Sequence, residues 1–414
     1  MADVNRTLSV RSLGVVLLWT CAVAGCSSVQ RDGPREPSLP SADPAVLARL
    51  RAGSMLTWRG EDQRIGYANM DKLAPTNVVR RGTRTWPLRE APRDFSTFTY
   101  TFRGTTHNLD AFMARLNVVG LLVVTDGQIV LERYARGHTA DSRWESWSVA
   151  KSVTSLLFGA AVRDGHLTLD DQVSKYIPSL AGTSYDGVTL RHLLQMSSGV
   201  AWNGNMADPQ SDVGQLPRLN KEGGLAAQIT YLGSKPRKAP PGTVFNYNTA
   251  EADLTAAVLQ AATGKTLSDY LSEKIWRPFG MESDAYWITM GTSGLERAGC
   301  CLSATLRDYG RLGLLALREG VAPDDSRPLP EGWIAESTRS SPASKGYGYF
   351  WWLRRNGGYF ASGSFGQHIE IAPARRTVVA VQSYWPEAYS DELIEHNDSV
   401  VEALIAFASA KPIR

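Results

Sequence analysis

Apolar residues recur at every second position in several parts of the chain, which is the pattern of half-buried β-strands. Residues 117–136 contain two such runs on either side of Asp126 and Gly127, a dipeptide that favours the tight turn of a hairpin. Strand-like alternation returns late in the chain in three segments separated by turn residues: 346–355, 358–372 and 376–385. The pattern therefore predicts an antiparallel sheet that combines an early hairpin with a late meander.

Helical spacing of apolar residues flanks these strands. Residues 148–162 are almost all apolar or small, and a second apolar stripe follows Ser390 near the end of the chain. Residues 166–294 contain several helical patterns separated by loops with Gly and Pro. We therefore expect an α/β fold of the α+β kind: an antiparallel sheet flanked by N- and C-terminal helices, with an inserted, mostly helical subdomain.

The first residues have the pattern of an export signal. Two arginines precede the apolar stretch 13–24, which is shorter than the roughly 20 residues that a membrane-spanning helix needs. Residues 23–26, Val-Ala-Gly-Cys, resemble the lipobox of bacterial lipoproteins, which implies cleavage before Cys26 and acylation of its thiol. A plain signal peptide cleaved nearby is the alternative. Ser27 resembles the pattern sorted to an outer membrane, so we expect an exported bacterial protein that its lipid anchors to that membrane, facing the periplasm.

The chain is thus expected to contain three parts. Residues 1–25 are the lipoprotein signal peptide, residues 26–50 are a polar, proline-containing flexible tether, and residues 51–414 form one domain. Within that domain, we expect the sheet part at about 100–165 and 295–414 and the helical part at about 166–294.

Composition excludes several classes of protein. The 414 residues are 43% hydrophobic and 21% charged, which is typical of a globular protein with a sizeable core. The formal net charge is only +3 and no run of Lys or Arg stands out, so we expect no nucleic-acid partner. The six histidines are scattered without the spacing of a ligand set, so we expect neither a catalytic metal nor another cofactor.

The cysteines leave one pair to be explained. If Cys21 departs with the signal and Cys26 carries lipid, only the neighbours Cys300 and Cys301 remain. Adjacent cysteines lack the spacing of a metal site or of a disulfide framework. Two small buried thiols are the favoured interpretation, and an oxidising compartment also permits a vicinal disulfide.

The helix predicted to begin at Ser148 carries a lysine where an apolar side chain is expected. Residues three apart share a helix face, so the amine of Lys151 can reach the Ser148 hydroxyl. A neutral amine can take the proton of a serine, and burial together with the positive end of the helix dipole favours the neutral form. The alternative is a capping serine with a solvated lysine, but the following residues leave little polar face. We predict a nucleophile and its base.

Two later segments offer complementary groups. Tyr247 lies just before a predicted helix, and its phenol can relay a proton between Ser148 and a leaving group; a core tyrosine bonded to backbone is the alternative. A later strand contains Gly363 and Gly366, where a substrate can approach the backbone closely. A backbone N–H after Gly363 can then hold an oxyanion, and a strand bulge or edge kink is the alternative.

Together and in this order, these segments resemble the serine hydrolases of the β-lactamase and DD-peptidase group. They are most similar to the class C branch with the family VIII esterases and the 6-aminohexanoate-dimer hydrolases. The similarity spans roughly residues 110–405, and no G-x-S-x-G motif of the α/β-hydrolases occurs. Three motifs carry it: Ser148-Val149-Ala150-Lys151 for S-x-x-K, Tyr247-Asn248-Thr249 for Y-x-N, and Ala361-Ser362-Gly363 for K-T-G.

The resemblance implies a β-lactamase/DD-peptidase-like fold and a role for each motif. Ser148 would be the acylated nucleophile, Lys151 and Tyr247 would share the acid and base work, and the N–H groups of Ser148 and Ser364 would form the oxyanion hole. The remaining motif residues would contribute to binding the substrate: Thr249, Ser362 and Gly363.

Departures from the family pattern narrow the expected substrate. Ala361 stands where β-lactamases keep a cationic lysine, and Thr249 replaces the asparagine of Y-x-N. We therefore expect a carboxylesterase or a 6-aminohexanoate-oligomer-type amidase acting on a small ester or amide. The alternatives are β-lactamase or DD-peptidase activity and a non-catalytic lipoprotein that binds peptidoglycan or a partner. Four aromatic side chains either wall an apolar pocket or pack in the core: Trp202, Tyr347, Tyr349 and Trp351.

Overall fold

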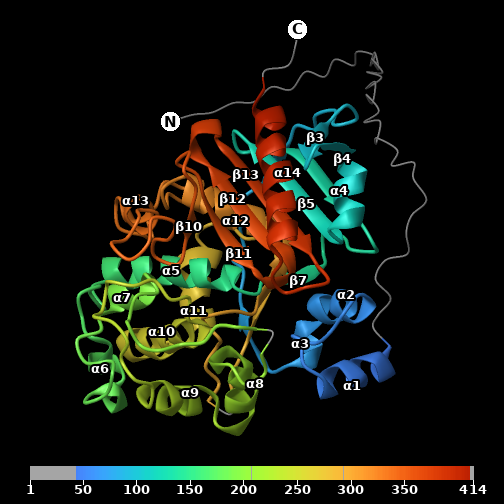
Figure 1. Cartoon of the computed structure of the whole chain (residues 1–414). Helices are drawn as coiled ribbons and strands as arrows, with labels where there is room; N and C mark the ends of the chain where they lie inside the picture. The colour runs from blue at the N-terminus through green and yellow to red at the C-terminus, as the bar shows by residue number, and fades with distance from the viewer. Residues whose placement is uncertain (1–42, 207, 292, 411–414) are drawn as a thin grey trace, which may run out of the picture. The chain divides into compact units, whose positions relative to one another are not determined.

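The computed structural model describes residues 43–206, 208–291 and 293–410 (Figure 1). The predicted signal peptide, the lipidation site Cys26 and the tether up to residue 42 lie outside the described residues. Among the described residues, no helix combines the length and the apolar character needed to cross a bilayer.

The main sheet has seven strands in the order β10-β11-β12-β13-β5-β6-β2. Its neighbours pair antiparallel, except that β2 runs parallel to β6. The predicted combination of an early hairpin with a late antiparallel meander is therefore confirmed. The strands are β2 (Arg89–Glu90), β5 (Val118–Thr125), β6 (Gln128–Tyr134), β10 (Trp352–Leu353), β11 (Tyr359–Gly363), β12 (Gln367–Ala372) and β13 (Thr377–Ser383).

Two of the strand predictions are wrong in detail. The segment 358–372 is not one strand but the hairpin of β11 and β12, because Phe365 and Gly366 adopt φ of 59° and 90° and reverse the chain. In the segment 346–355 only β10 is a strand, since Phe350 with φ of 60° interrupts the extended backbone.

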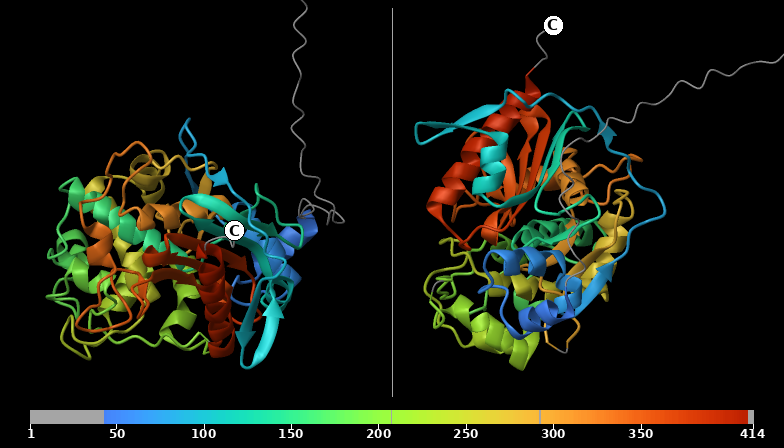
Figure 2. Two further views of the ribbon diagram at one scale, coloured as in Figure 1. Left: turned by 90° about the horizontal axis from the view of Figure 1, so that it is seen from above. Right: turned by 90° about the vertical axis from the view of Figure 1, so that its right-hand side faces the viewer.

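Helices cover both faces of the main sheet (Figures 1 and 2). Leu121 and Val123 of β5 pack in one apolar cluster with the C-terminal helix α14 (Asp391–Ser409) and with α4 (Leu109–Arg115). The alternate residues Leu122 and Val124 point to the other face, toward α5 (Val149–Arg163) and α12 (Leu306–Leu317). This antiparallel sheet between helices confirms the predicted fold class. Ser390 caps α14 as its position predicts.

The chain between the two halves of the main sheet is mostly helical. The predicted helical part extends too far, to residue 294. Trp287 and its neighbours form a strand, β8, in a second sheet of order β1-β8-β9-β7. That sheet comprises β1 (Thr76–Val79), β7 (Arg143–Glu145), β8 (Ala285–Ile288) and β9 (Leu302–Thr305). The helices are α6 (Val173–Tyr176), η1 (Pro178–Leu180), α7 (Leu190–Leu194), α8 (Asp212–Glu222), α9 (Gly224–Gly233), α10 (Thr249–Thr263), α11 (Leu267–Leu271) and η2 (Ser272–Trp276).

The predicted tether ends earlier than residue 50. The side chain of Asp43 caps helix α1 (Pro44–Ala52), Pro44 occupies its first position, and Leu50 is buried. Leu50 packs in a third apolar cluster with Trp58 and other side chains, so the end of the tether belongs to the folded domain. The remaining elements are α2 (Glu61–Ala68), α3 (Met70–Leu73), β3 (Thr99–Phe102), β4 (Thr105–Asn108), α13 (Trp333–Ser337), η3 (Ser364–Gly366) and η4 (Pro373–Arg375).

Candidate active site

Ser148 stands at the start of α5 but does not cap it. The helix runs through the core, where residues 149–161 are all buried, and the Ser148 side chain makes no capping hydrogen bond. Trp147, just before it, adopts φ of 48°, and its N–H donates to the Glu145 carboxylate at 3.0 Å. This constrained turn leaves the Ser148 hydroxyl available for other contacts.

Lys151 lies one turn further along α5 and is only 1% exposed. Its Nζ contacts three oxygens: Ser148 Oγ at 3.0 Å, Thr249 Oγ1 at 3.3 Å and the Gly299 carbonyl at 2.5 Å. A neutral amine has two N–H donors and one lone pair, so it can donate to Gly299 and Thr249 while accepting the proton of Ser148. The alternative of a solvated lysine does not hold in this structure.

Burial governs the charge of this amine. Desolvation lowers the pKa of Lys151 from 10.5 to about 7, because the ammonium form loses its hydration. Asp253 opposes the shift, whereas the positive charge of Arg297 reinforces it. A large fraction of Lys151 is therefore an uncharged base near neutral pH.

Tyr247 precedes α10, whose first turn is capped by the neighbouring Asn248. The Lys151 Nζ lies 4.9 Å from the centre of the Tyr247 ring, and Trp352 stacks on the ring at 5.7 Å between centroids. Burial raises the pKa of Tyr247 to about 12, with a smaller opposite effect from its interaction with Ser148. The phenol therefore keeps its proton at neutral pH and can donate it.

The end of β11 lies against the start of α5 because Gly363 has no side chain. A Cβ there would fall 2.4 Å from the Ser146 carbonyl and 3.0 Å from the Ser148 nitrogen. In the turns, loops and caps of the described residues, neither the N–H of Ser148 nor that of Ser364 donates to a backbone carbonyl. These two N–H groups are thus available to a ligand oxygen.

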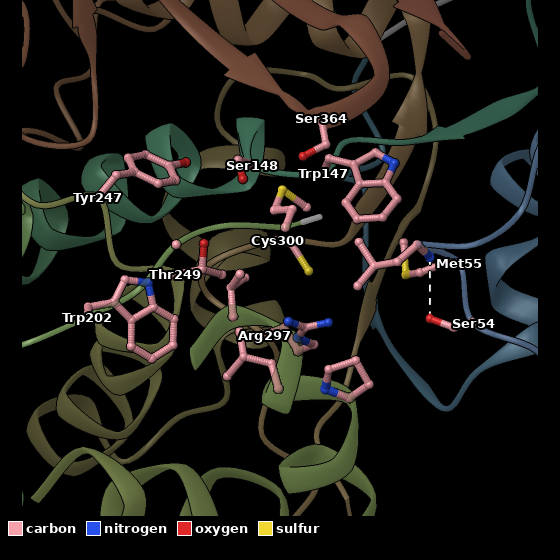
Figure 3. Close-up of a pocket in the computed structure, with 16 residues that line it drawn as sticks. Ser54, Met55, Trp147, Ser148, Trp202, Tyr247, Thr249, Arg297, Cys300 and Ser364 are labelled. Carbon is pink, nitrogen blue, oxygen red and sulfur yellow. Dashed lines mark hydrogen bonds between the residues drawn. The ribbon is translucent and has the colours of Figure 1, made fainter. Parts of the chain in front are cut away.

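A cavity that is open to solvent, with about 840 Å³ of empty space, lies in front of Ser148 (Figure 3). Trp202 forms part of its wall, whereas the other three aromatic candidates are buried in the core and Ser362 lies outside the lining. The lining residues are Ser54, Met55, Leu56, Trp147, Ser148, Trp202, Gly204, Met206, Val213, Leu216, Pro217, Tyr247, Thr249, Arg297, Cys300 and Ser364. The described acidic residues, histidines and cysteines form no group of three or more that could hold a metal ion.

Three residues that the sequence analysis did not single out support Lys151. The Gly299 carbonyl accepts a hydrogen bond from the Lys151 amine, and the Gly299 N–H donates to Asp253 Oδ1 at 2.8 Å. Arg297 lies two residues before it and 3.7 Å from Asp253. Their contacts join parts of the chain that are far apart in sequence, and no local motif marks them.

Cys300 and Cys301 are joined in a vicinal disulfide, so the favoured interpretation of two free thiols is wrong. Both residues are buried, and Cys301 adopts φ of 82°. Cys300 lines the cavity directly after the segment that holds Lys151. The disulfide therefore constrains the backbone next to the site.

A family model and two related proteins match this chain, and the three matches agree with one another. The model of the Beta-lactamase family matches residues 105–397, which include all the predicted catalytic groups. The chain is 27% identical over 354 residues to the 6-aminohexanoate-dimer hydrolase of Paenarthrobacter ureafaciens, covering 78% of this chain and 86% of that protein. It is 25% identical over 260 residues to esterase EstB of Burkholderia gladioli, covering 61% and 60% of the two chains.

Solved structures share the fold. The "Putative 6-aminohexanoate-dimer hydrolase from Bacillus anthracis" superposes with a TM-score of 0.76 at 23% identity, covering 87% of this chain and 98% of that one. EstCE1, described as a hydrolase with promiscuous acyltransferase activity, gives a TM-score of 0.57 at 17% identity over 70% of this chain and 98% of its own. These likenesses confirm the β-lactamase-like architecture.

Proposed function

The chain is a serine hydrolase that belongs to the Beta-lactamase family, and we propose that Ser148 is its nucleophile. The observation that carries the proposal is the buried amine of Lys151, 3.0 Å from Ser148 Oγ and with its pKa lowered to about 7. A serine hydroxyl becomes an effective nucleophile when such a base accepts its proton.

In the first step, Ser148 Oγ bonds to the carbonyl carbon of the substrate while its proton moves to Lys151 Nζ. The carbonyl oxygen takes up the displaced electron pair. The N–H groups of Ser148 and Ser364 stabilise this oxyanion, which a helix N-terminus also favours.

In the second step, the bond from the carbonyl carbon to the leaving oxygen or nitrogen breaks. The Tyr247 phenol donates a proton to the leaving group, and the Lys151 ammonium restores the phenol, so an acyl ester remains on Ser148. Water then attacks this ester with Lys151 as base. The acid product departs and Ser148 recovers its proton.

The substrate class we propose is a small ester or linear amide. Ala361 is buried in the core at the position of the family's cationic lysine, so this position cannot hold the carboxylate of a β-lactam. Carboxylesterase activity and 6-aminohexanoate-oligomer amidase activity both fit, in keeping with the relatives that carry those names. These activities can be ranked by measuring turnover of a panel of substrates. The panel contains short and long acyl esters, an aminohexanoate dimer, a chromogenic cephalosporin and a D-Ala-D-Ala peptide.

A fluorophosphonate probe tests the nucleophile. We expect the wild type to gain the mass of one adduct and Ser148→Ala to gain none. Ser155→Ala is the matched control, since Ser155 is a buried serine of the same helix, and it should be labelled like the wild type. Absence of labelling in every variant would instead favour a lipoprotein that binds a ligand without turnover.

We further propose that the protein is exported and anchored through a lipid on Cys26, with the catalytic domain in the periplasm. The lipobox-like residues 23–26 support this proposal. Labelled palmitate should enter the wild-type protein and not Cys26→Ser. Equal incorporation in both, or none in either, would contradict it.

A further inference from the structure

The cavity in front of Ser148 is lined by one permanently charged group, which the proposed reaction does not use. Most of its wall is apolar, including Met55, Trp202 and Leu216, and its other polar groups carry no charge near neutral pH. Among the lining residues that the structure describes, Arg297 is the one that carries a permanent charge. Figure 3 shows its guanidinium across the cavity from Ser148 and Ser364, beyond Cys300.

Within the described part of the chain, the guanidinium of Arg297 lacks hydrogen-bond partners. Its Nε is fully buried and unpaired, and the nearest carboxylate oxygen, Asp253 Oδ2, is 3.7 Å away, beyond hydrogen-bond range. Asp253 already accepts from the Gly299 N–H at 2.8 Å and from Gln228 Nε2 at 3.3 Å. Its charge offsets that of Arg297, but it leaves the donors of the guanidinium unused.

A second buried arginine shows what a structural role looks like in this fold. Arg311 bonds to Asp308 at 3.1 Å and to the Trp86 carbonyl at 2.9 Å, and forms an ion pair with Glu282 at 3.0 Å. Its donors are used within the protein. Arg297 differs because its side chain reaches a cavity and is 17% exposed.

The position of Arg297 is nevertheless fixed. Its N–H donates to the Ile288 carbonyl at 2.9 Å, and its own carbonyl accepts from Trp287 Nε1 at 2.8 Å. Both partners belong to β8, so the second sheet holds the backbone of Arg297 beside the cavity. A positioned guanidinium with free donors in an apolar surrounding is suited to bind a carboxylate through paired hydrogen bonds.

We propose that Arg297 binds a carboxylate on the substrate, joined to the scissile ester or amide by a short apolar chain. This inference rests on the proposed function of Ser148 and adds the substrate class. The apolar wall would contact the chain while the guanidinium holds its anionic end. A chain that ends in an ammonium would place like charges together in a site of low polarity, so such substrates should be poor.

Three p-nitrophenyl esters of equal acyl length test the proposal: the adipate half-ester, the hexanoate and the 6-aminohexanoate, which end in a carboxylate, a methyl and an ammonium group. If the cavity holds the acyl chain, the wild type has its highest kcat/KM for the adipate half-ester and its lowest for the 6-aminohexanoate. In a 6-aminohexanoate oligomer the carboxylate lies on the leaving group, which the second arm covers. Acetate esters of 6-hydroxyhexanoate and of hexanol form the second arm, which applies if the cavity holds the leaving group.

The variant Arg297→Met should lower the ratio of kcat/KM for the carboxylate substrate to that for the methyl-ended substrate by about 10- to 100-fold, because charged hydrogen bonds are lost. Arg297→Lys, which keeps the charge without the paired donors, should retain part of the ratio. Rates are compared on the plateau of each pH profile, since Arg297 also affects Lys151. The control Arg80→Met removes an exposed arginine and should leave the ratio unchanged.

Two results would overturn the inference: a wild type that shows no preference for the carboxylate in either arm, or an Arg297→Met variant that loses all substrates equally. Fluorophosphonate labelling of Arg297→Met shows whether the variant is folded. Failure of the proposed function is distinguishable, because the wild type would then hydrolyse none of the esters and form no adduct on Ser148.

Discussion

At the scale of single residues, the proposed chemistry depends on one uncharged amine. Lys151 is enclosed by the protein, and one of its three oxygen contacts is the Ser148 hydroxyl, whose proton the lone pair of a neutral amine can accept. Burial raises the pKa of Tyr247 to about 12, so its phenol keeps its proton at neutral pH and is not the base there. The environments of the two groups thus separate their roles.

Substitution of Lys151 tests its assignment as the base. Lys151→Ala and Lys151→Met should each lower kcat/KM for the best ester by about 10²- to 10⁴-fold, because the general base is lost. Lys151→Met should fold at least as well as the wild type, since it replaces a buried amine with an apolar chain of similar length. Steady-state kinetics and thermal denaturation provide the readouts. Near-normal rates in both variants would show that another group is the base.

At the scale of elements, the site forms where three segments distant in sequence meet. The start of α5 supplies the proposed nucleophile and base, the start of α10 supplies Thr249, and the end of β11 leads into Ser364, whose N–H belongs to the proposed oxyanion hole. The close approach of β11 to α5 depends on Gly363, because a Cβ there would meet backbone atoms that cannot rotate away.

Gly363→Ala should therefore distort the predicted oxyanion hole. We expect a loss of stability of about 1–3 kcal/mol from overpacking, together with a fall in kcat larger than the change in KM. Gly346→Ala is the matched control, as a Cβ at Gly346 has no heavy atom within 4 Å and its φ is not in the left-handed region. If Gly363→Ala behaved like Gly346→Ala in both assays, the role assigned to this contact would be wrong.

The sequence predicts those parts of the site that depend on local geometry. Ser148 and Lys151 are three residues apart on one helix, so their contact follows from helical spacing. Gly299 and Arg297 could not be predicted, because they reach Lys151 through tertiary packing across about 150 residues of chain. The segment around Phe350 was wrongly predicted as a strand, since buried aromatic residues alternate there without extended backbone.

At the scale of the whole molecule, the functional domain is larger than the family match. Residues 105–397 match the family, yet Met55 and Leu56 line the cavity, and Tyr67 packs edge-on against Trp147 at 5.7 Å between ring centroids. Trp147 directly precedes Ser148. The N-terminal segment therefore packs against the residue before the proposed nucleophile and forms part of the cavity wall.

Two truncated chains test the role of residues 43–104. A chain that begins at Asp43 keeps every described element and should hydrolyse esters like the protein without truncation. A chain that begins at Thr105 loses α1–α3 and β1–β3 and should be unstable or inactive, because Trp147 loses Tyr67 and β8 loses its neighbour β1. Activity and circular dichroism of the two chains are compared under the same conditions. Full activity of the shorter chain would contradict a role for residues 43–104.

The most direct test of the central claim is the rate of Ser148 acylation by a fluorophosphonate as a function of pH. The pKa of Lys151 is lowered to about 7, so the fraction of neutral amine, and with it the rate, should rise through about pH 7 and level off above it. A rate that is constant between pH 5 and 9, or that keeps rising toward the ordinary pKa of a lysine of about 10.4, would contradict a neutral Lys151 as the base.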